Sequence, residues 1–238
     1  MRQSWSIVVF CFNEAGMVGE IVNLIVRQFD EHRKNLYEII VVDDGSTDGS
    51  YEVIAALKRA RPDVIKIIRH EKNLGIGAAL RHGYEAAKNE NLTAVPADGQ
   101  FDVQELIPHL NIENNTFISF YRLENVQYSP FRNALSAANK YVNRVFNGIE
   151  LKDVNWVKIY KREAIRSFPW KLKSSLIESE ICAKLLLRGE RAIEVLSYYH
   201  PRKSGKSKGA SLPVIIHALR ETMKLILVVR EFRKSLLK

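Results

Sequence analysis

Strand-like and helix-like segments alternate through the first 110 residues, and this alternation constrains the fold more than any other feature. Four apolar runs have the length and the β-branched content of buried strands, and they are residues 6–12, 37–44, 64–69 and 92–97. Apolar residues at helical spacing follow each of the first three runs, in residues 15–29, about 49–60, and a stretch ending near Lys88. Strands that alternate with helices over short connections predict an α/β fold, with a mostly parallel central sheet and helices on both faces.

The second half of the chain is less regular. Its expected strands are residues 116–121, 154–160 and 191–198, and its expected helices are residues 131–147 and 175–188. From about Leu212 the sequence predicts a basic amphipathic helix, whose longest apolar stretch, residues 225–229, is far too short to span a bilayer. Such a helix can lie on a membrane face, or it can pack against its own domain or a second subunit.

The length and composition suit one large α/β domain with a tail. The chain has 238 residues, of which 46% are hydrophobic and 26% are charged, as in an ordinary globular protein. Its two cysteines, Cys11 and Cys182, both lie inside apolar runs. This position predicts free, buried thiols rather than a disulfide, which suits a reducing compartment.

The net charge of +9 is concentrated at the C-terminal end. Residues 201–238 hold ten Lys and Arg and two Glu, so this segment contributes +8 and the first 200 residues are nearly neutral. A basic end predicts an anionic partner, such as phosphates, a membrane surface or nucleic acid, and a solvated tail is the alternative. Phe232 is the one Phe, Tyr or Trp among the basic residues of this tail, and so few interleaved aromatics speak against nucleic acid.

Polar side chains stand where the expected strands end, at the edge where parallel sheets bind their ligands. Asp43 and Asp44 can accept hydrogen bonds from a nucleobase N–H or from ribose hydroxyls, or Asp44 and Asp48 can serve only as turn and cap residues. Asp98, between Pro96 and Gln100, either holds a metal ion or turns the chain. The stretch that begins at Gly75 lacks the third glycine of a dinucleotide-binding motif, which favours a tight helix entry.

Four segments, taken in order, are far more specific than any one of them. They are Phe12-Asn-Glu, Val-Val-Asp-Asp-Gly-Ser-Thr-Asp, Asn-Leu-Gly-Ile-Gly-Ala-Ala and Ala-Asp-Gly-Gln. This order resembles family 2 glycosyltransferases with the GT-A fold, and most closely the branch of dolichyl- and polyprenyl-phosphate sugar synthases. The resemblance covers about residues 5–208. It implies a nucleotide-sugar half (1–110), an acceptor half (111–208) and a separate C-terminal helix (209–238).

The resemblance also implies three groups of site residues. Asp98 and Gln100 would be the catalytic and metal-binding residues, with Asp98 at the diphosphate and Gln100 helping to ligate Mg²⁺ or Mn²⁺. Residues expected to contact the nucleotide-sugar are Phe10, Phe12, Glu14, Asp43, Asp44, Asn73 and Gly75. Residues expected to bind the acceptor or its phosphate are Arg122, Arg132, Ser136, Arg202, Lys203 and Lys206. Glu180 is expected to orient neighbouring groups rather than to perform chemistry.

Two positions depart from the family pattern. Pro96 replaces the second acid of the usual Asp-Ala-Asp, and proline cannot ligate a metal, which makes metal dependence a question for experiment. Residues 156–158, Trp-Val-Lys, replace a Gly-Phe-Arg-like turn that bears on the acceptor geometry.

The expected function is an inverting hexosyltransferase that moves a sugar from a UDP- or GDP-sugar to a polyprenyl or dolichyl phosphate. A divalent cation would neutralise the leaving diphosphate, and an anionic phosphate acceptor needs little from a general base. The protein would act at the cytoplasmic face of the membrane, bound peripherally through its basic C-terminus, alone, as a homo-oligomer or with a membrane partner subunit. The alternatives are a transferase acting on a saccharide hydroxyl, which requires a general base, and a non-catalytic nucleotide-sugar-binding subunit.

Overall fold

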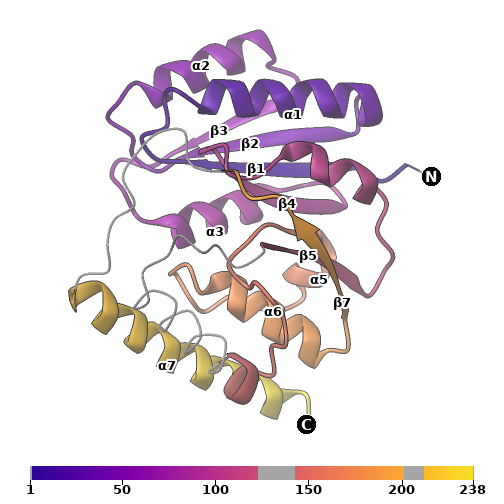
Figure 1. Ribbon diagram of the computed structural model, residues 1–238, viewed down its shortest axis with the longest axis vertical. Coiled ribbons are helices and arrows are strands. Elements are labelled where there is room, and N and C mark those ends of the chain that lie inside the picture. Colours follow the sequence, from indigo (N-terminus) through magenta and orange to yellow (C-terminus); the bar gives the residue numbers. More distant parts are fainter. Residues whose placement is uncertain (1, 123–142, 201–211, 238) are drawn as a thin grey trace.

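A seven-stranded sheet forms the centre of the molecule (Figure 1). The computed structural model describes residues 2–122, 143–200 and 212–237. The strands are β1 (Trp5–Cys11), β2 (Tyr37–Asp43), β3 (Ile65–Arg69), β4 (Asn91–Pro96), β5 (Thr116–Arg122), β6 (Lys158–Lys161) and β7 (Arg191–Ser197). Their order is β3-β2-β1-β4-β6-β5-β7. All neighbouring strands are parallel except β6, which is antiparallel to both β4 and β5.

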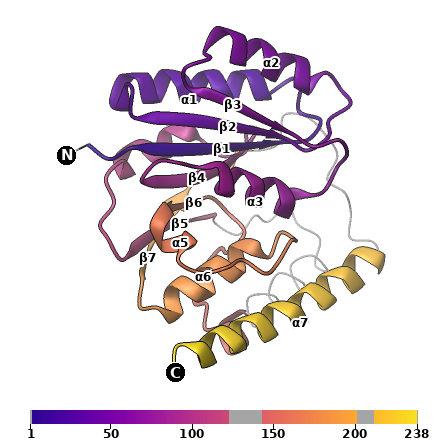
Figure 2. The same cartoon turned by 180° about the vertical axis from the view of Figure 1, so that it is seen from behind.

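Helices cover both faces of this sheet. They are α1 (Val18–Arg33), α2 (Ser50–Ala60), α3 (Ile76–Ala86), the 3₁₀ helix η1 (Val103–His109), α5 (Arg162–Arg166), α6 (Ile177–Leu187) and α7 (Leu212–Ser235). α1 and α2 lie on one side, and α3, α6 and α7 lie on the other (Figures 1 and 2). Successive β1 residues face opposite cores, because Ile7 and Val9 pack with α1 whereas Val8 packs with α3.

The expected α/β architecture and its mostly parallel sheet are therefore confirmed. The first four strands lie within one or two residues of the expected runs, and both cysteines are buried free thiols. η1 and α5 were not expected, because both are short and η1 contains Pro108. The expected helix at residues 131–147 lies largely outside the described residues. Its described part, residues 143–147, is helical.

The largest difference from the expected secondary structure is at residues 154–160. Only β6 pairs there, and residues 154–157 form a loop. The carbonyls of Val154 and Trp156 accept hydrogen bonds from Lys158 Nζ, at 2.8 and 2.9 Å, instead of joining a strand ladder. A buried ammonium group thus takes the acceptors that an extended strand would have used.

α7 packs lengthwise on α6 through Leu225 and Val229, which are both buried. α6 is consequently buried on all sides, between the sheet and α7. The inner face of the C-terminal helix thus packs on its own domain, which is one of the alternatives that the sequence left open. In the described ranges, no helix combines the length and the apolar content needed to span a membrane.

Candidate active site

The loops that follow β1 and β2 are joined into one unit. The backbone N–H of Asn13 donates to Ser46 Oγ at 2.9 Å, and Asn13 Oδ1 accepts from the N–H of Thr47 at 2.8 Å. Ala15 N–H donates to Asp48 Oδ2 at 3.0 Å. These contacts cross more than 30 residues of sequence, so the expected nucleotide-contacting residues after β1 and β2 share one ordered edge.

Asp44 holds the loop that begins α3. Its Oδ1 accepts from His70 Nδ1 at 2.7 Å and from Leu74 N–H at 2.8 Å, and its Oδ2 accepts from Gly75 N–H at 2.8 Å. The neighbouring Gly45 has φ +74°, and a Cβ there would lie 2.5 Å from the carbonyl carbon of Lys72. This close approach requires glycine. Asp44 therefore has a structural role, because it holds the loop at residues 74–75 against His70. Its expected contact with a nucleotide stays a prediction.

Asp43 is fully buried and behaves differently from its neighbour. Its Oδ1 accepts from Ser46 N–H at 3.1 Å, and its Oδ2 lies 3.6 Å from Nε of Arg69. Among the described residues, that Oδ2 has no hydrogen-bond donor. The two adjacent acids thus have distinct surroundings, which the sequence pattern did not separate.

The turn after β4 presents Asp98 and Gln100 at the same edge. Gly99 has φ +73°, and Gln100 N–H donates to Asp98 Oδ1 at 3.1 Å. The Gln100 side-chain amide donates to Tyr199 Oη at 2.5 Å, which leaves its carbonyl oxygen as an acceptor. His200 N–H donates to the backbone carbonyl of Gln100 at 3.1 Å. The chain therefore passes directly beside this turn just before it enters the basic segment.

A pocket of about 400 Å³ opens next to this turn. One wall is apolar and comes from α3, with Ile76, Leu80 and Tyr84 spaced four residues apart. Polar and charged residues at the pocket are Asp98, Gln100, Arg122, Asn155, Lys158, Ser175 and Glu178. The pocket thus combines an apolar wall with a small number of converging polar groups, as small-molecule sites do.

Arg122 supplies a fixed positive charge to the pocket. Its Nε donates to Asp153 Oδ2 at 2.8 Å, and its guanidinium lies over the Trp156 ring, 4.2 Å from the ring centroid. Trp156 is held in turn by a 2.9 Å hydrogen bond from its indole N–H to Ser197 Oγ. A guanidinium carries five N–H donors, so a stacked Arg122 paired through Nε can still bind an anion.

The sequence reading missed a buried carboxylate in the pocket. Glu178 accepts from the Tyr84 hydroxyl at 2.5 Å and from the Tyr160 hydroxyl at 2.6 Å. Burial raises the pKa of both tyrosines well above their usual value, which keeps them protonated as donors. The sequence does offer a hint of buried charge here, because Glu178 lies two residues before Glu180 in a largely apolar segment. Lys158, a charged residue inside an apolar run, is a second hint of the same kind.

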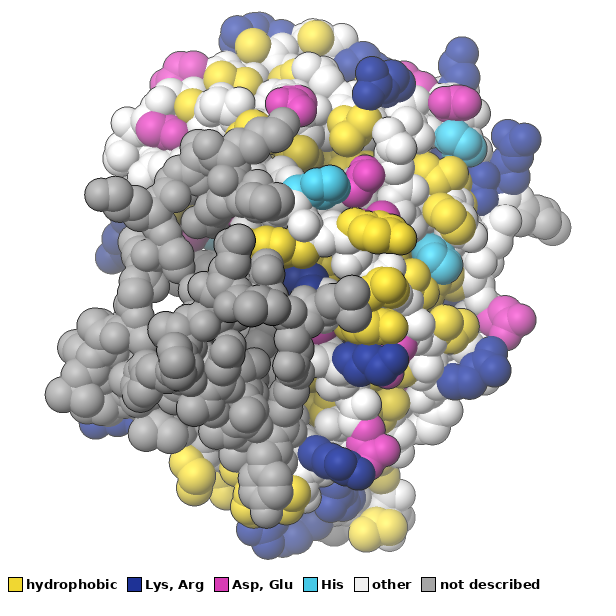
Figure 3. Space-filling view, in the orientation of Figure 1, with side chains coloured by type: hydrophobic (Ala, Val, Ile, Leu, Met, Phe, Trp, Pro, Cys, Tyr) yellow, Lys and Arg dark blue, Asp and Glu magenta, His cyan; other side chains and the backbone are white. Residues whose placement is uncertain are grey.

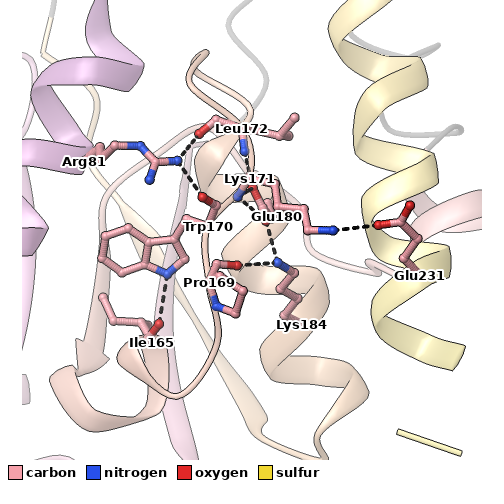
Figure 4. Close-up of polar contacts among 9 residues, drawn as sticks. All are labelled: Arg81, Ile165, Pro169, Trp170, Lys171, Leu172, Glu180, Lys184 and Glu231. Atoms are coloured by element: carbon pink, nitrogen blue, oxygen red, sulfur yellow. Dashed lines mark hydrogen bonds and ion pairs between the residues drawn. The ribbon is translucent and has the colours of Figure 1, made fainter. Parts of the chain in front are cut away.

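Glu180 anchors the loop that precedes α6 (Figure 4). Its carboxylate accepts from the N–H groups of Lys171 and Leu172 and from Lys184 Nζ, at 2.5 to 3.0 Å. The side chains of Glu180 and Lys184 are 0% and 2% exposed. These contacts show that Glu180 holds the backbone of residues 171–172 and the Lys184 ammonium group, and its role in the reaction stays a prediction.

The same loop is tied to two further helices (Figure 4). Arg81 of α3 donates to the carbonyls of Trp170 and Leu172 at 2.9 and 2.5 Å. Lys171 forms an exposed 2.6 Å ion pair with Glu231 of α7. Because Ser175 and Leu176 of this loop line the pocket, its anchoring fixes part of the pocket wall.

The oxygen atoms of Asp98 and Gln100 fit a divalent cation only if a bound diphosphate and water supply further oxygen atoms. Asp98 offers carboxylate oxygens and Gln100 an amide oxygen, which are the hard donors that Mg²⁺ and Mn²⁺ take. No group of three or more His, Cys, Asp or Glu residues suited to a metal is present in the described ranges. Diphosphate oxygens and water would therefore have to complete the coordination shell.

The structure brings most of the expected site residues to one edge and leaves others outside its description. Residues after β1, β2 and β4, the loop at residues 73–75 and Arg122 lie around the strand ends. Five acceptor-side residues lie outside the described residues, namely Arg132, Ser136, Arg202, Lys203 and Lys206.

Solved structures with the same fold include sugar-transferring synthases. The chain is similar to glucosyl-3-phosphoglycerate synthase from Mycobacterium tuberculosis in complex with UDP, with a TM-score of 0.67, 16% identity, and coverage of 95% of this chain and 80% of that chain. It is similar to mannosyl-3-phosphoglycerate synthase from Rubrobacter xylanophilus, with a TM-score of 0.67, 17% identity, and coverage of 98% and 75%. The fold is thus that of the GT-A class.

Residues 6–168, more than half of the chain, match the family model of glycosyl transferase family 2. The chain belongs to this family. It is 29% identical over 165 residues to an undecaprenyl-phosphate 4-deoxy-4-formamido-L-arabinose transferase of Aeromonas hydrophila, covering 67% of this chain and 49% of that protein. It is 33% identical over 102 residues to a dolichyl-phosphate beta-glucosyltransferase of Trichomonas vaginalis, covering 41% and 30%. The chain spans half or less of the length of these relatives.

Proposed function

We propose that this chain transfers a sugar from a UDP- or GDP-sugar to a polyprenyl or dolichyl phosphate, with inversion, at the cytoplasmic face of a membrane. The observation that carries the proposal is the pocket at the strand ends, where the Asp98 turn and the fixed Arg122 cation lie around one space. The names of the two relatives, which act on undecaprenyl phosphate and dolichyl phosphate, support the acceptor class.

In this proposal Asp98 and Gln100 would hold Mg²⁺ or Mn²⁺ beside the donor diphosphate. When bound, the cation neutralises the charge that develops on the leaving diphosphate. Solved relatives of the same fold with UDP and Mn²⁺ or Mg²⁺ support this cofactor. Arg122 orients the acceptor phosphate, whose oxygen forms a bond to the anomeric carbon as the bond to the diphosphate breaks. The electron pair leaves with the nucleoside diphosphate, and an ionised phosphate has no proton to remove.

Glu178 favours a second candidate, transfer to a saccharide hydroxyl. That reaction needs a general base, and Glu178 is a carboxylate that lines the pocket. Its oxygens already accept hydrogen bonds from two tyrosines, which is why the phosphate acceptor remains the first choice. Loss of transfer to a saccharide in Glu178→Gln would favour the hydroxyl acceptor.

A panel of nucleotide-sugars tests the proposal, run with and without a short polyprenyl phosphate and scored by sugar transfer to lipid. We expect transfer from one UDP- or GDP-sugar that requires both the lipid phosphate and a divalent cation. Binding without turnover, unaffected by Asp98→Ala, would instead assign the chain to a non-catalytic nucleotide-sugar-binding subunit. Absence of binding by every nucleotide-sugar would contradict the proposal altogether.

The outer face of α7 supports peripheral membrane contact. Met223 and Leu227 are 60% and 55% exposed there, and exposed basic residues flank them, namely Arg220, Lys224, Arg230, Arg233 and Lys234. The short helix at residues 143–147 lies beside the end of α7 and exposes Val145 and Phe146 (Figures 1 and 2). Basic and hydrophobic side chains mix at this end of the molecule (Figure 3). Apolar side chains ringed by cations match an anionic lipid surface.

We expect the chain to bind vesicles that contain phosphatidylglycerol, and not pure phosphatidylcholine vesicles, with affinity that falls as salt rises. The double variant Met223→Asp, Leu227→Asp should bind at least about tenfold more weakly, because it removes apolar burial and adds repulsion. Tyr198→Asp is the control, since Tyr198 is 72% exposed and directly follows β7 rather than belonging to α7. Equal binding by both variants would exclude the α7 face, and dimerisation through that face would assign it to a second copy.

A further inference from the structure

Two histidines near the strand ends have no role in the proposed chemistry. His70 follows β3 and is 6% exposed, and His82 lies in the middle of α3. Their imidazoles are joined by a 2.7 Å hydrogen bond between His70 Nε2 and His82 Nδ1, with the rings nearly perpendicular. The other nitrogen of His70, Nδ1, donates to Asp44 at 2.7 Å.

These groups form a closed ring of contacts with the start of α3. Asp44 accepts from the N–H groups of Leu74 and Gly75, immediately before the first helical residue. The chain then runs along α3 to His82. His82 contacts His70, and His70 contacts the same Asp44 carboxylate, which closes the ring. α3 lacks a side-chain cap of its own at Gly75. The Asp44 carboxylate, which directly follows β2, therefore supplies an acceptor for N–H groups at the helix start.

We infer that His70 and His82 are positioning residues that set the rotation of α3, and with it the apolar wall of the pocket. On the side of this ring, α3 is held just before its first residue, through residues 74–75, and again at His82. Arg81 and Tyr84 hold the other side of the helix through the contacts described above. Ile76, Leu80 and Tyr84, which line the pocket, lie on one face of the helix. His82 points instead to His70 and so joins the ring of contacts around Asp44. A helix fixed at two points cannot rotate about its axis without breaking one of them. The kinetic part of this inference rests on the proposed function.

The chemistry of each nitrogen defines variants that separate positioning from bulk. His82 uses Nδ1, which the side-chain amide of asparagine can replace, whereas leucine cannot bond to His70. His70 uses both of its nitrogens, so no single amide replaces it. We expect His82→Asn to behave like the wild type and His82→Leu to lose the ring. The effects of His70→Asn and His82→Leu should be non-additive, because each removes the same link.

Two measurements test the inference. In hydrogen exchange, the peptide that contains the amides of Leu74 and Gly75 should exchange faster in His82→Leu and not in His82→Asn. In kinetics, His82→Leu should lower kcat/KM for the nucleotide-sugar by about tenfold to a hundredfold. Its affinity for the nucleoside diphosphate alone should fall by a smaller factor than kcat/KM, because most of the residues expected to contact the nucleotide follow β1, β2 and β4 and do not belong to the α3 wall.

The outcomes are distinguishable from failure of the proposed function. If the wild type transfers no sugar from any donor, the proposed function fails, and unchanged exchange in His82→Leu would still overturn the ring. If the wild type is active, faster exchange with normal kinetics would overturn the positioning role. Equal effects of the asparagine and leucine variants would show that the Nδ1 contact is not what matters, and this result would also overturn the inference.

Discussion

Replacing Asp98 by asparagine is expected to lower sugar transfer by about 10²- to 10³-fold, the range found when one electrostatic stabiliser of a transition state is removed. Asparagine keeps an oxygen that accepts from Gln100 N–H, so the turn should persist. It removes the charge that attracts a divalent cation. Initial rates at saturating nucleotide-sugar, measured over a range of Mn²⁺ concentrations, check this expectation.

Asp102→Asn is the matched control for this variant. Asp102 lies four residues away and accepts from Gln104 N–H at the start of η1. It undergoes the same change of charge without lining the pocket, and we expect near-normal rates. Similar losses in both variants would show that net charge, rather than a cation at Asp98, explains the effect.

The second large effect is expected on stability, from Glu180→Ala. Removing this carboxylate leaves Lys184, whose side chain is 2% exposed, without its counter-charge, and leaves the N–H groups of Lys171 and Leu172 without an acceptor. Breaking a buried ion pair in this way costs about 3–5 kcal/mol. Urea denaturation followed by circular dichroism should report this fall in the free energy of unfolding.

Glu231→Ala provides the control within the same network. Glu231 pairs with Lys171 at the exposed surface of α7, where ion pairs contribute little because water and salt screen them. We expect its unfolding curve to overlay that of the wild type. Equal destabilisation by the two variants would contradict the assignment of Glu180 as the anchor of the loop before α6.

The sheet could be predicted because each of its strands is indicated by a short, continuous stretch of sequence. Apolar runs and short connections determine strands and helices one after another, so β1 to β4 and the turn at Asp98 could be placed in advance. The Tyr84–Glu178 contact joins residues 94 positions apart, and the Arg81–Leu172 contact joins residues 91 apart. No periodicity within a segment reports such pairs, which is why Glu178 was not predicted to line the pocket.

Asp44 shows a different limit. A carboxylate at a strand end reads equally well as a ligand for ribose and as a structural acceptor. The choice depends on whether nearby N–H groups reach it. Here Leu74, Gly75 and His70 all do. That arrangement depends on the path of a loop 30 residues later, which the residues around Asp44 do not encode.

Calorimetric titration of UDP and of GDP into the full chain, with Mn²⁺ and then with EDTA, tests the central claim most directly. The account predicts saturable binding of one nucleotide, tightened at least about tenfold by Mn²⁺, and loss of that metal dependence in Asp98→Asn. Absence of binding by both nucleotides, or binding that neither EDTA nor Asp98→Asn changes, would contradict it.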